Sequence, residues 1–325
     1  MEELGEPRYR AEQMMRWIYQ QDAASIDEVT NLSKALRQRL SRLVEIERLQ
    51  VETCEQSVDG TRKFLFRLRD GATIEAVLIP DGPRRTACIS SQAGCGIGCP
   101  FCATGLGGLV RNLRAGEIVD QILAIQRLTG ERVSHVVFMG MGEPFANYAQ
   151  VIKAARLLSD RCGVGLGARR LTISTSGVVP AIRRFSEERV QFGLAISLHA
   201  ATDEVRNILV PLNRKYPIAE LMDACREYVA RTNRRVTFEY VMIRDLNDGP
   251  DQAERLAELL SGMLCHVNLI PLNPVPETGL ERSTPEAIRR FAAIVKGAGI
   301  EVTTRRERGT DIQAACGQLR RSRGR

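Results

Sequence analysis

Three cysteines lie within eight residues of the chain: Cys95, Cys99 and Cys102 are separated by three and then two intervening residues. This spacing holds three thiolates close together. A tetrahedral structural zinc site needs a fourth nearby Cys or His, and the next histidine, His135, lies far along the chain. Three thiolates suit a cubane iron–sulfur cluster that keeps one iron open for a ligand. The sequence therefore favours an iron–sulfur cluster, with zinc as the alternative.

Six further cysteines raise the question of whether their thiols pair, pack or react. A disulfide framework is not expected, because the cytoplasm, the location predicted below, keeps thiols reduced. Four of the six stand alone in ordinary surroundings, where a small buried hydrophobe is the expected role: Cys54, Cys162, Cys225 and Cys265. Cys88 and Cys316 remain as candidates for chemistry.

Helical stretches alternate with short apolar runs from Cys95 to the end of the chain. The apolar runs are expected to be strands: residues 133–139, 171–174, 192–198, 236–243, 266–270 and 301–304. Such alternation predicts βα units around a parallel sheet. A parallel α/β barrel brings the carboxyl ends of its strands to one mouth, where ligands bind.

The ends of these expected strands carry polar and glycine residues that could contact a ligand. They are: Gly142, Glu143, Ser174, Ser197, Leu198, His199 and Asn273. We expect one site built from all of them. Taken singly, His199 is more typical of a satisfied structural histidine, and Asn273, which precedes a proline, is more typical of a turn.

Residues 1–91 are organised differently. Residues 10–45 carry apolar side chains at helical spacing and predict a small helical module. Residues 46–91 contain β-type runs at 63–68 and 73–79, with Asp-Gly turns at 59–60 and 70–71, and predict a hairpin or small sheet. The expected domains are a helical module (1–45), a β-rich extension (46–91), an α/β core (92–319) and a basic tail (320–325).

Composition indicates a globular chain with a net positive charge. The 325 residues are 44% hydrophobic and 26% charged, which is typical of a protein with a sizeable core. No apolar run reaches the roughly 20 residues that span a bilayer, and the first residues lack a secretion signal. A cytoplasmic location without a membrane partner is expected.

The formal charge of +7 favours a polyanionic partner such as RNA. Only five of the 46 basic residues are lysine, although an arginine bias also arises in GC-rich genomes. The candidate contacts are: Arg169, Arg170, Arg234, Arg235, Arg305, Arg306, Arg308 and the tail at 320–325. The alternative reading of such charge runs is a solvated face.

Two motifs together resemble those of the radical S-adenosylmethionine superfamily. Phe101 places an aromatic residue before the last of the three cysteines, and residues 139–144 read MGMGEP. The resemblance implies a partial (βα)6 barrel and a [4Fe-4S] cluster on the three cysteines, with S-adenosylmethionine chelated to the open iron. Gly142 and Glu143 would hold the amino group of that cofactor, and an electron from the cluster would cleave it to a 5′-deoxyadenosyl radical.

The chain resembles the RlmN/Cfr family of RNA methyltransferases more closely still, and its RlmN branch most of all. The resemblance extends over nearly the full length and is carried by these segments: RAEQ at 10–13, SKAL at 33–36, SSQAGC at 90–95, STSGVVP at 174–180, SLHA at 197–200 and RGTDIQAACGQL at 308–319. So many matches in the same order identify the chain as similar to this family.

The family resemblance implies a mechanism that uses two S-adenosylmethionine molecules per turnover. One methylates the sulfur of Cys316, and the radical from the second removes a hydrogen from that methyl group. Cys88 would form a transient disulfide with Cys316 as the product leaves. Glu75 would accept the ring proton, although a carboxylate within a strand is more typical of a solvated face. The remaining cofactor contacts would be Ser174, Ser197, Leu198, His199 and Asn273.

The implied substrates are 23S ribosomal RNA, in the peptidyl-transferase region, and tRNA, at the adenosine next to the anticodon. Methylation at carbon 2 is the expected reaction, and carbon 8 is the Cfr-like alternative. A flavodoxin or ferredoxin would supply electrons, and the chain is expected to be a monomer. Two other readings remain: a zinc-containing RNA-binding protein without activity, and a radical enzyme that acts on a peptide or metabolite.

Overall fold

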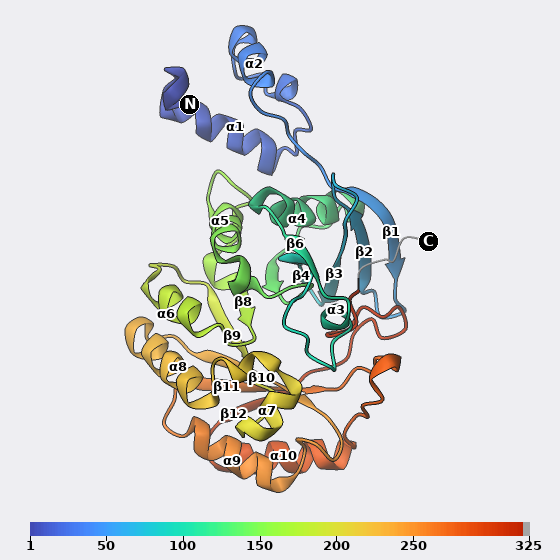
Figure 1. Cartoon of the computed structure of the whole chain (residues 1–325). Helices are drawn as coiled ribbons and strands as arrows, with labels where there is room; N and C mark the ends of the chain where they lie inside the picture. Colours follow the sequence, from blue (N-terminus) through green and yellow to red (C-terminus); the bar gives the residue numbers. More distant parts are fainter. Residues whose placement is uncertain (321–325) are drawn as a thin grey trace.

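The computed structural model describes residues 1–320. One sheet runs through this part of the chain in the order β1-β2-β3-β4-β7-β8-β9-β10-β11-β12 (Figure 1). Its strands are: β1 (Gln50–Gln56), β2 (Arg62–Arg67), β3 (Thr73–Asp81), β4 (Arg84–Cys88), β7 (His135–Phe138), β8 (Leu171–Thr175), β9 (Gly193–Ser197), β10 (Val236–Met242), β11 (Cys265–Pro271) and β12 (Glu301–Thr304). A separate pair consists of β5 (Gln92–Gly94) and β6 (Leu109–Asn112).

The strands from β4 through β12 form a parallel sheet. Each neighbouring pair in this half is parallel, from β4·β7 to β11·β12. All six predicted runs between residues 133 and 304 are strands, and the predicted α/β fold is confirmed. These strands read as nearly continuous apolar runs because most of their side chains are buried.

Helices connect the parallel strands and arc around one side of the sheet (Figure 1). They are: α3 (Ala103–Leu106), α4 (Ala115–Thr129), α5 (Tyr148–Ser159), α6 (Val179–Glu187), α7 (Asp203–Leu209), α8 (Ile218–Thr232), α9 (Pro250–Leu260) and α10 (Pro285–Gly297). Short 3₁₀ turns lie at: Glu2–Leu4, Ile26–Glu28, Pro144–Asn147, Ala168–Arg170, Pro211–Arg214 and Pro276–Thr278.

Helix α10 shows why these segments are helical. The Thr284 hydroxyl caps its first turn by accepting from the Ala287 amide at 3.2 Å, and a proline occupies an early position. Ile288, Phe291 and Val295 then recur at helical spacing and are buried. In residues 1–320, no helix combines the length and apolar character that a bilayer crossing requires.

The β-rich segment continues the parallel sheet rather than standing apart from it. Strands β1 to β4 pair with one another in antiparallel fashion, and β4 then pairs in parallel with β7. Both predicted Asp-Gly turns are present, with Gly60 at φ +84° and Gly71 at φ +82°, a conformation that glycine adopts without steric cost. The extension therefore lengthens the main sheet beyond β4.

Strand β1 forms an edge of the sheet, and all seven of its residues are exposed. The expectation that Cys54 is buried is therefore wrong, because a strand that pairs on one side only leaves this thiol open to solvent. The other three isolated cysteines, Cys162, Cys225 and Cys265, are buried as expected.

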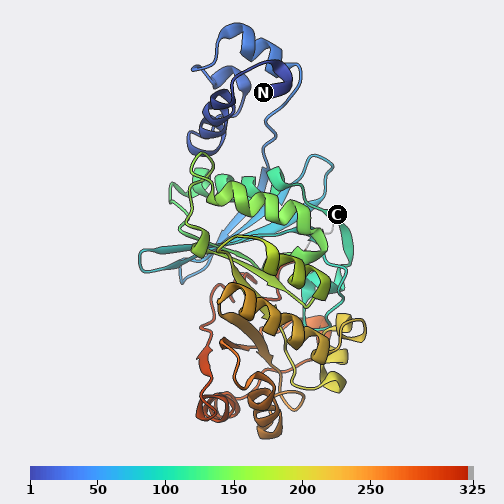
Figure 2. The ribbon, with the colours of Figure 1, turned by 90° about the vertical axis from the view of Figure 1, so that its left-hand side faces the viewer.

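The N-terminal module projects from one end of the α/β body (Figures 1 and 2). It contains α1 (Arg8–Gln20) and α2 (Lys34–Ser41). The module has its own small core, which includes Ile26, Val29, Leu36 and Leu40. Its helical character agrees with the prediction, while the proposed domain boundaries remain predictions.

Candidate functional site: a three-cysteine cavity at the strand ends

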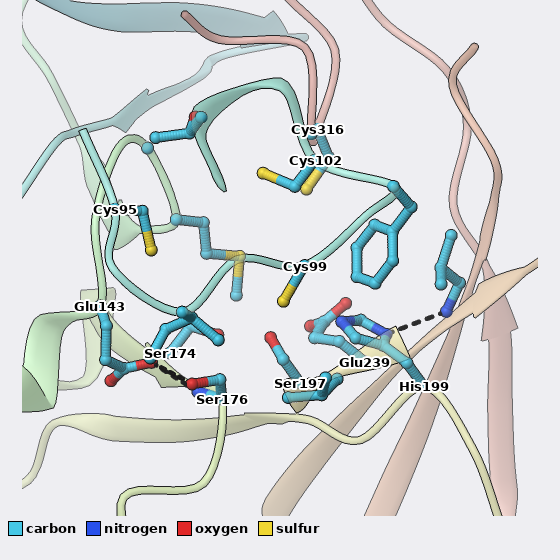
Figure 3. A pocket seen from close by; sticks show the side chains of 18 of the residues that line it. Cys95, Cys99, Cys102, Glu143, Ser174, Ser176, Ser197, His199, Glu239 and Cys316 are labelled. Carbon is cyan, nitrogen blue, oxygen red and sulfur yellow. Dashed lines mark hydrogen bonds between the residues drawn. The ribbon is translucent and has the colours of Figure 1, made fainter. Parts of the chain in front are cut away.

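A cavity lies at the carboxyl ends of the parallel strands, and Figure 3 shows its side chains. Most of the predicted site residues line it: Cys95, Cys99, Cys102, Gly142, Glu143, Ser174, Ser197, His199, Asn273 and Cys316. Leu198 is fully buried behind the wall, and Glu75 and Cys88 lie outside the lining. The topology thus brings together residues that are more than 200 positions apart in the chain.

The three cysteines sit on a loop that is folded tightly back on itself. The Cys95 amide donates to the Gly108 carbonyl at 3.0 Å, and the Cys102 amide donates to the Cys99 carbonyl at 3.2 Å. Gly94 has φ +79°, and a Cβ at this position would overlap the Gly108 carbonyl oxygen. The loop therefore requires glycine directly before its first cysteine.

Burial raises the pKa of the Cys95 thiol to about 12 and raises that of Cys99 as well. Coordination to iron deprotonates such thiols outright. The raised pKa values therefore do not prevent cluster binding, and burial would shield a bound cluster from solvent. In the described part of the chain, no three His, Cys, Asp or Glu side chains converge on a single ion. Zinc needs four such ligands at about 2.0–2.3 Å, whereas cysteines around a cubane hold separate irons. The arrangement fits the cluster better than zinc.

Glu143 is held in one orientation at the cavity wall. One carboxylate oxygen accepts from the Phe145 amide at 2.9 Å, and the other accepts from the Ser176 amide and hydroxyl, both at 2.7 Å (Figure 3). Burial raises its pKa, and the hydrogen bonds from Ser176 oppose that effect. Gly142, at φ +101°, precedes it, and a Cβ there would meet the Gln92 Cβ at 2.5 Å. The glycine therefore lets Glu143 approach the cysteine loop.

His199 ends the β9 segment in the left-handed conformation, at φ +62°. Its Nδ1 accepts from the Val241 amide at 3.1 Å, and burial lowers the pKa of the ring to about 3 (Figure 3). The imidazole is therefore neutral, with its proton on Nε2. The Phe101 ring packs edge-on at 5.0 Å between centroids. His199 can thus offer one fixed N–H donor to a ligand.

Asn273 connects the cavity to the chain segment that carries Cys316. Its amide nitrogen donates to the Cys316 carbonyl at 3.0 Å, which fixes the orientation of the amide. Its Oδ1 is buried and has no hydrogen-bond partner. Because an unsatisfied buried acceptor costs about 1–3 kcal/mol, this oxygen fits a ligand that brings its own donor, such as the ribose hydroxyls or amines of S-adenosylmethionine.

The two candidate reactive thiols, Cys88 and Cys316, lie close enough for the charge of Cys316 to affect Cys88. Burial and, to a smaller extent, the charge of Cys316 raise the pKa of Cys88 to about 12, and the charge of Arg305 opposes them. Burial also raises the pKa of Cys316, whereas a hydrogen bond from the Arg305 guanidinium lowers it. Arg305, one of the arginines considered for RNA contact, instead faces these thiols. Both thiols are free.

Glu75 is buried on β3, with 6% of its surface exposed, so the solvated-face reading is wrong. Its carboxylate accepts from the Arg320 amide at 2.7 Å and lies 3.7 Å from the Lys63 ammonium. Burial raises its pKa, and the Arg320 amide and Lys63 oppose this. The C-terminal segment that follows Cys316 covers this face of the hairpin.

Sequence reasoning missed two polar residues around the cavity. Glu239 lines it, accepts from the Asn268 amide at 2.7 Å, and has its pKa raised by burial. A carboxylate in the middle of the apolar run 236–243 was the available signal, since buried charges are rare without a reason. The second, Arg206, lies in a helix that carried no such signal.

Two family descriptions match the chain. One, described as "Radical SAM superfamily", matches residues 89–260, and the other, "Ribosomal RNA large subunit methyltransferase N-terminal domain", matches residues 1–46. A solved structure of a radical SAM methyltransferase from Sphaerobacter thermophilus has a TM-score of 0.91 at 51% identity and covers 97% of this chain and 94% of that one. Fold and site together define a radical S-adenosylmethionine enzyme, which uses a [4Fe-4S] cluster and S-adenosylmethionine.

Curated relatives narrow the assignment. "Probable dual-specificity RNA methyltransferase RlmN" from Symbiobacterium thermophilum is 51% identical over 324 residues, covering 98% of this chain and 87% of the relative. A protein of the same name from Thermoanaerobacter sp. is 48% identical over 319 residues, covering 98% and 93%. The chain belongs to the RlmN family of radical S-adenosylmethionine RNA methyltransferases.

Proposed function

We propose that this enzyme methylates carbon 2 of adenosine in 23S ribosomal RNA and in tRNA next to the anticodon, through a methyl group carried on Cys316. The relatives named as dual-specificity RlmN enzymes support the two substrates. The observation that carries the mechanism is the position of Cys316, which lines the same cavity as the three cysteines of the cluster motif. Two molecules of S-adenosylmethionine would be consumed per turnover.

The cofactors would occupy the cavity described above. Cys95, Cys99 and Cys102 would hold the cluster, and the bound cluster and S-adenosylmethionine supply a methyl group and a carbon radical. The proposed contacts of S-adenosylmethionine are Gly142, Glu143, Ser174, Ser197, Leu198, His199 and Asn273. Glu143 presents an oriented carboxylate to an ammonium group, while His199 and Asn273 offer one donor and one acceptor.

Cys316 accepts the methyl group in this proposal, because its sulfur faces the cavity and its backbone is held by Asn273. The Arg305 guanidinium stabilises the thiolate of Cys316, which is the nucleophilic form. A ring carbon of adenine is a poor nucleophile, so the methyl carbon must be activated on sulfur before it joins the ring. Apolar side chains such as Ile97 and Leu272 line the cavity and exclude water from the reaction.

Glu75 and Cys88 would complete the reaction after the carbon is attached. Burial raises the pKa of Glu75, which makes its carboxylate a better acceptor for the ring proton. Cys88 lies near Cys316 and would attack its sulfur. A transient disulfide would form as the sulfur–carbon bond breaks, and the electron pair of that bond would leave with the methylene carbon, which takes up a proton to become the methyl group of the base. The Arg320 amide, which now occupies the Glu75 carboxylate, would have to withdraw when RNA binds.

The mode of RNA binding, the electron donor, the cellular location and the oligomeric state belong to the same proposal. The substrate adenosine must be unstacked to reach the cavity, so binding would rely on phosphate contacts and RNA shape, which a charge of +7 supports. A flavodoxin or ferredoxin would deliver the electrons. We place the enzyme in the cytoplasm, where both of its RNA substrates occur. It would act there as a monomer.

Two variants test the mechanism. Cys316→Ala should abolish RNA methylation, whereas Cys88→Ala should trap a protein–RNA adduct that gel shift and mass spectrometry detect after denaturation. Nucleoside analysis of the product should show 2-methyladenosine. The 8-methyl isomer would instead support the Cfr-like alternative, and turnover by Cys316→Ala would overturn the proposed carrier.

A further inference from the structure

Arg206 is a fully buried arginine behind the cavity wall, with 0% of its surface exposed. It lies on α7, the helix that follows β9 and the residues Leu198 and His199 in the chain. Burying a guanidinium is unfavourable unless its donors are satisfied. Such a side chain persists only where the contacts that it makes compensate for this cost.

The guanidinium donates to oxygen atoms from three parts of the fold. Its Nη2 reaches the Ser176 carbonyl at 2.7 Å and the Ser197 carbonyl at 3.3 Å, and its Nε reaches the Leu198 carbonyl at 3.0 Å. Its Nη1 donates to the Asn213 side-chain oxygen at 2.7 Å. One planar group therefore ties the end of β8 to the end of β9.

These two neighbouring strand ends carry different parts of the cavity wall. On the β8 side, the Ser176 amide and hydroxyl orient the Glu143 carboxylate. On the β9 side, Ser197 and His199 line the cavity, and His199 adopts a left-handed conformation that needs support from its neighbours. Arg206 bonds to the backbone of both sides, so it fixes the distance between them.

We propose that Arg206 is a positioning residue that sets the affinity of the enzyme for S-adenosylmethionine by holding the Glu143 and His199 sides of the site in register. The inference rests on the proposed location of the cofactor in this cavity. It assigns a role to a buried residue that does not itself line the cavity.

The shape of the side chain explains why arginine is required. A guanidinium presents five donors in a rigid fork and can serve several carbonyls at once. A lysine at this position keeps the charge but offers a single nitrogen, so some carbonyls at the strand ends would lose their donor. A ligand that contacts both sides needs them placed to within about 0.5 Å, and relaxation of the wall would therefore weaken binding.

The test measures equilibrium binding of S-adenosylmethionine to the anaerobically reconstituted full chain. Arg206→Lys should raise the dissociation constant by about tenfold or more, equivalent to about 1.4 kcal/mol, with the iron content unchanged. Arg48→Lys is the matched control, because Arg48 also donates to backbone carbonyls, those of Ala23 and Ile18, but lies at the N-terminal module. That control should bind S-adenosylmethionine like the parent protein.

Two outcomes separate this inference from the proposed site. If Glu143→Gln weakens binding and Arg206→Lys leaves it within twofold, the role of Arg206 is refuted and the site stands. If neither variant weakens binding, the location of the cofactor is refuted. Should Arg206→Lys fail to fold, Asn213→Ala removes the partner of Nη1, together with the hydrogen bonds that Asn213 donates to Asp203 and Asn207, and should still weaken binding several-fold. Unchanged affinity in that variant overturns the inference.

Discussion

Replacing Gly94 by alanine should prevent the cysteine loop from binding its cluster, whereas Gly98→Ala, four residues along the same loop, should not. Both glycines have positive φ, +79° and +76°. They differ in their surroundings, because an added Cβ at Gly94 overlaps the Gly108 carbonyl oxygen, while one at Gly98 meets nothing within 4 Å. The pair therefore separates backbone strain from steric overlap.

The magnitudes follow from these contacts. A left-handed conformation costs an L-residue roughly 1–2 kcal/mol, and both variants share that cost. Gly94→Ala adds an overlap of about 1–3 kcal/mol. It also weakens the hydrogen bond from the Cys95 amide to the same Gly108 oxygen, a loss of about 0.5–1.5 kcal/mol. The difference between the two variants is about 1.5–4.5 kcal/mol. It lowers the fraction of molecules whose loop can bind the cluster by a factor of roughly ten to a thousand.

The assay is anaerobic reconstitution with iron and sulfide, followed by iron analysis and visible absorption. Gly98→Ala should retain most of the iron of the parent protein, and Gly94→Ala should retain little. Circular dichroism should show that both proteins are folded, because the loop lies outside the main sheet. Equal iron content in the two variants would refute the steric argument.

Three further predictions concern buried polar groups. Burial raises the folded-state pKa of Glu239 above its ordinary value of 4.5, so its favourable contribution to stability is present below that value and is lost as the pH rises through the folded-state pKa. Glu239→Gln should therefore melt above the parent protein at pH 8 and converge with it near pH 4.5; a variant that melts lower throughout would show that attraction to Arg305 dominates. Asp120 on α4 accepts from the Arg48 guanidinium at 2.8 Å and from the Leu49 amide at 2.6 Å, so Asp120→Asn should weaken the attachment of the segment that follows the N-terminal module by about 1–3 kcal/mol. Limited proteolysis should then release the module faster, and parent-like cleavage would argue against this anchor. Asn273→Asp keeps an oxygen toward the cofactor but loses the donor to the Cys316 carbonyl, so binding of S-adenosylmethionine should persist while methylation of Cys316, followed by peptide mass spectrometry, slows by about tenfold; an unchanged rate would show that this hydrogen bond does not position Cys316.

Much of the site could be predicted from local patterns. The apolar runs identified the parallel strands, and the rule that their carboxyl ends share a mouth brought Glu143, Ser174, Ser197, His199 and Asn273 to one cavity. The spacing of the three cysteines indicated a cluster without any tertiary information. These signals are short in range, so the sequence displays them directly.

Other features depend on long-range packing that the sequence does not display. Glu75 alternates with apolar residues like a solvent-facing carboxylate, but the segment around Arg320, 245 positions away, covers it. Cys54 resembles a core thiol, yet the edge position of β1 exposes it. Arg305 was a candidate RNA contact, but the tertiary fold turns it toward the thiols. No local pattern marks Arg206 as a buried donor to backbone carbonyls.

Transfer of a labelled methyl group tests the central claim most directly. Enzyme whose Cys316 carries a deuterated methyl group would be given unlabelled S-adenosylmethionine, a reductant and RNA for a single turnover. The account predicts that deuterium appears in the methyl group of the product adenosine and disappears from the Cys316 peptide. Product that carries no deuterium, with the label retained on Cys316, would contradict it.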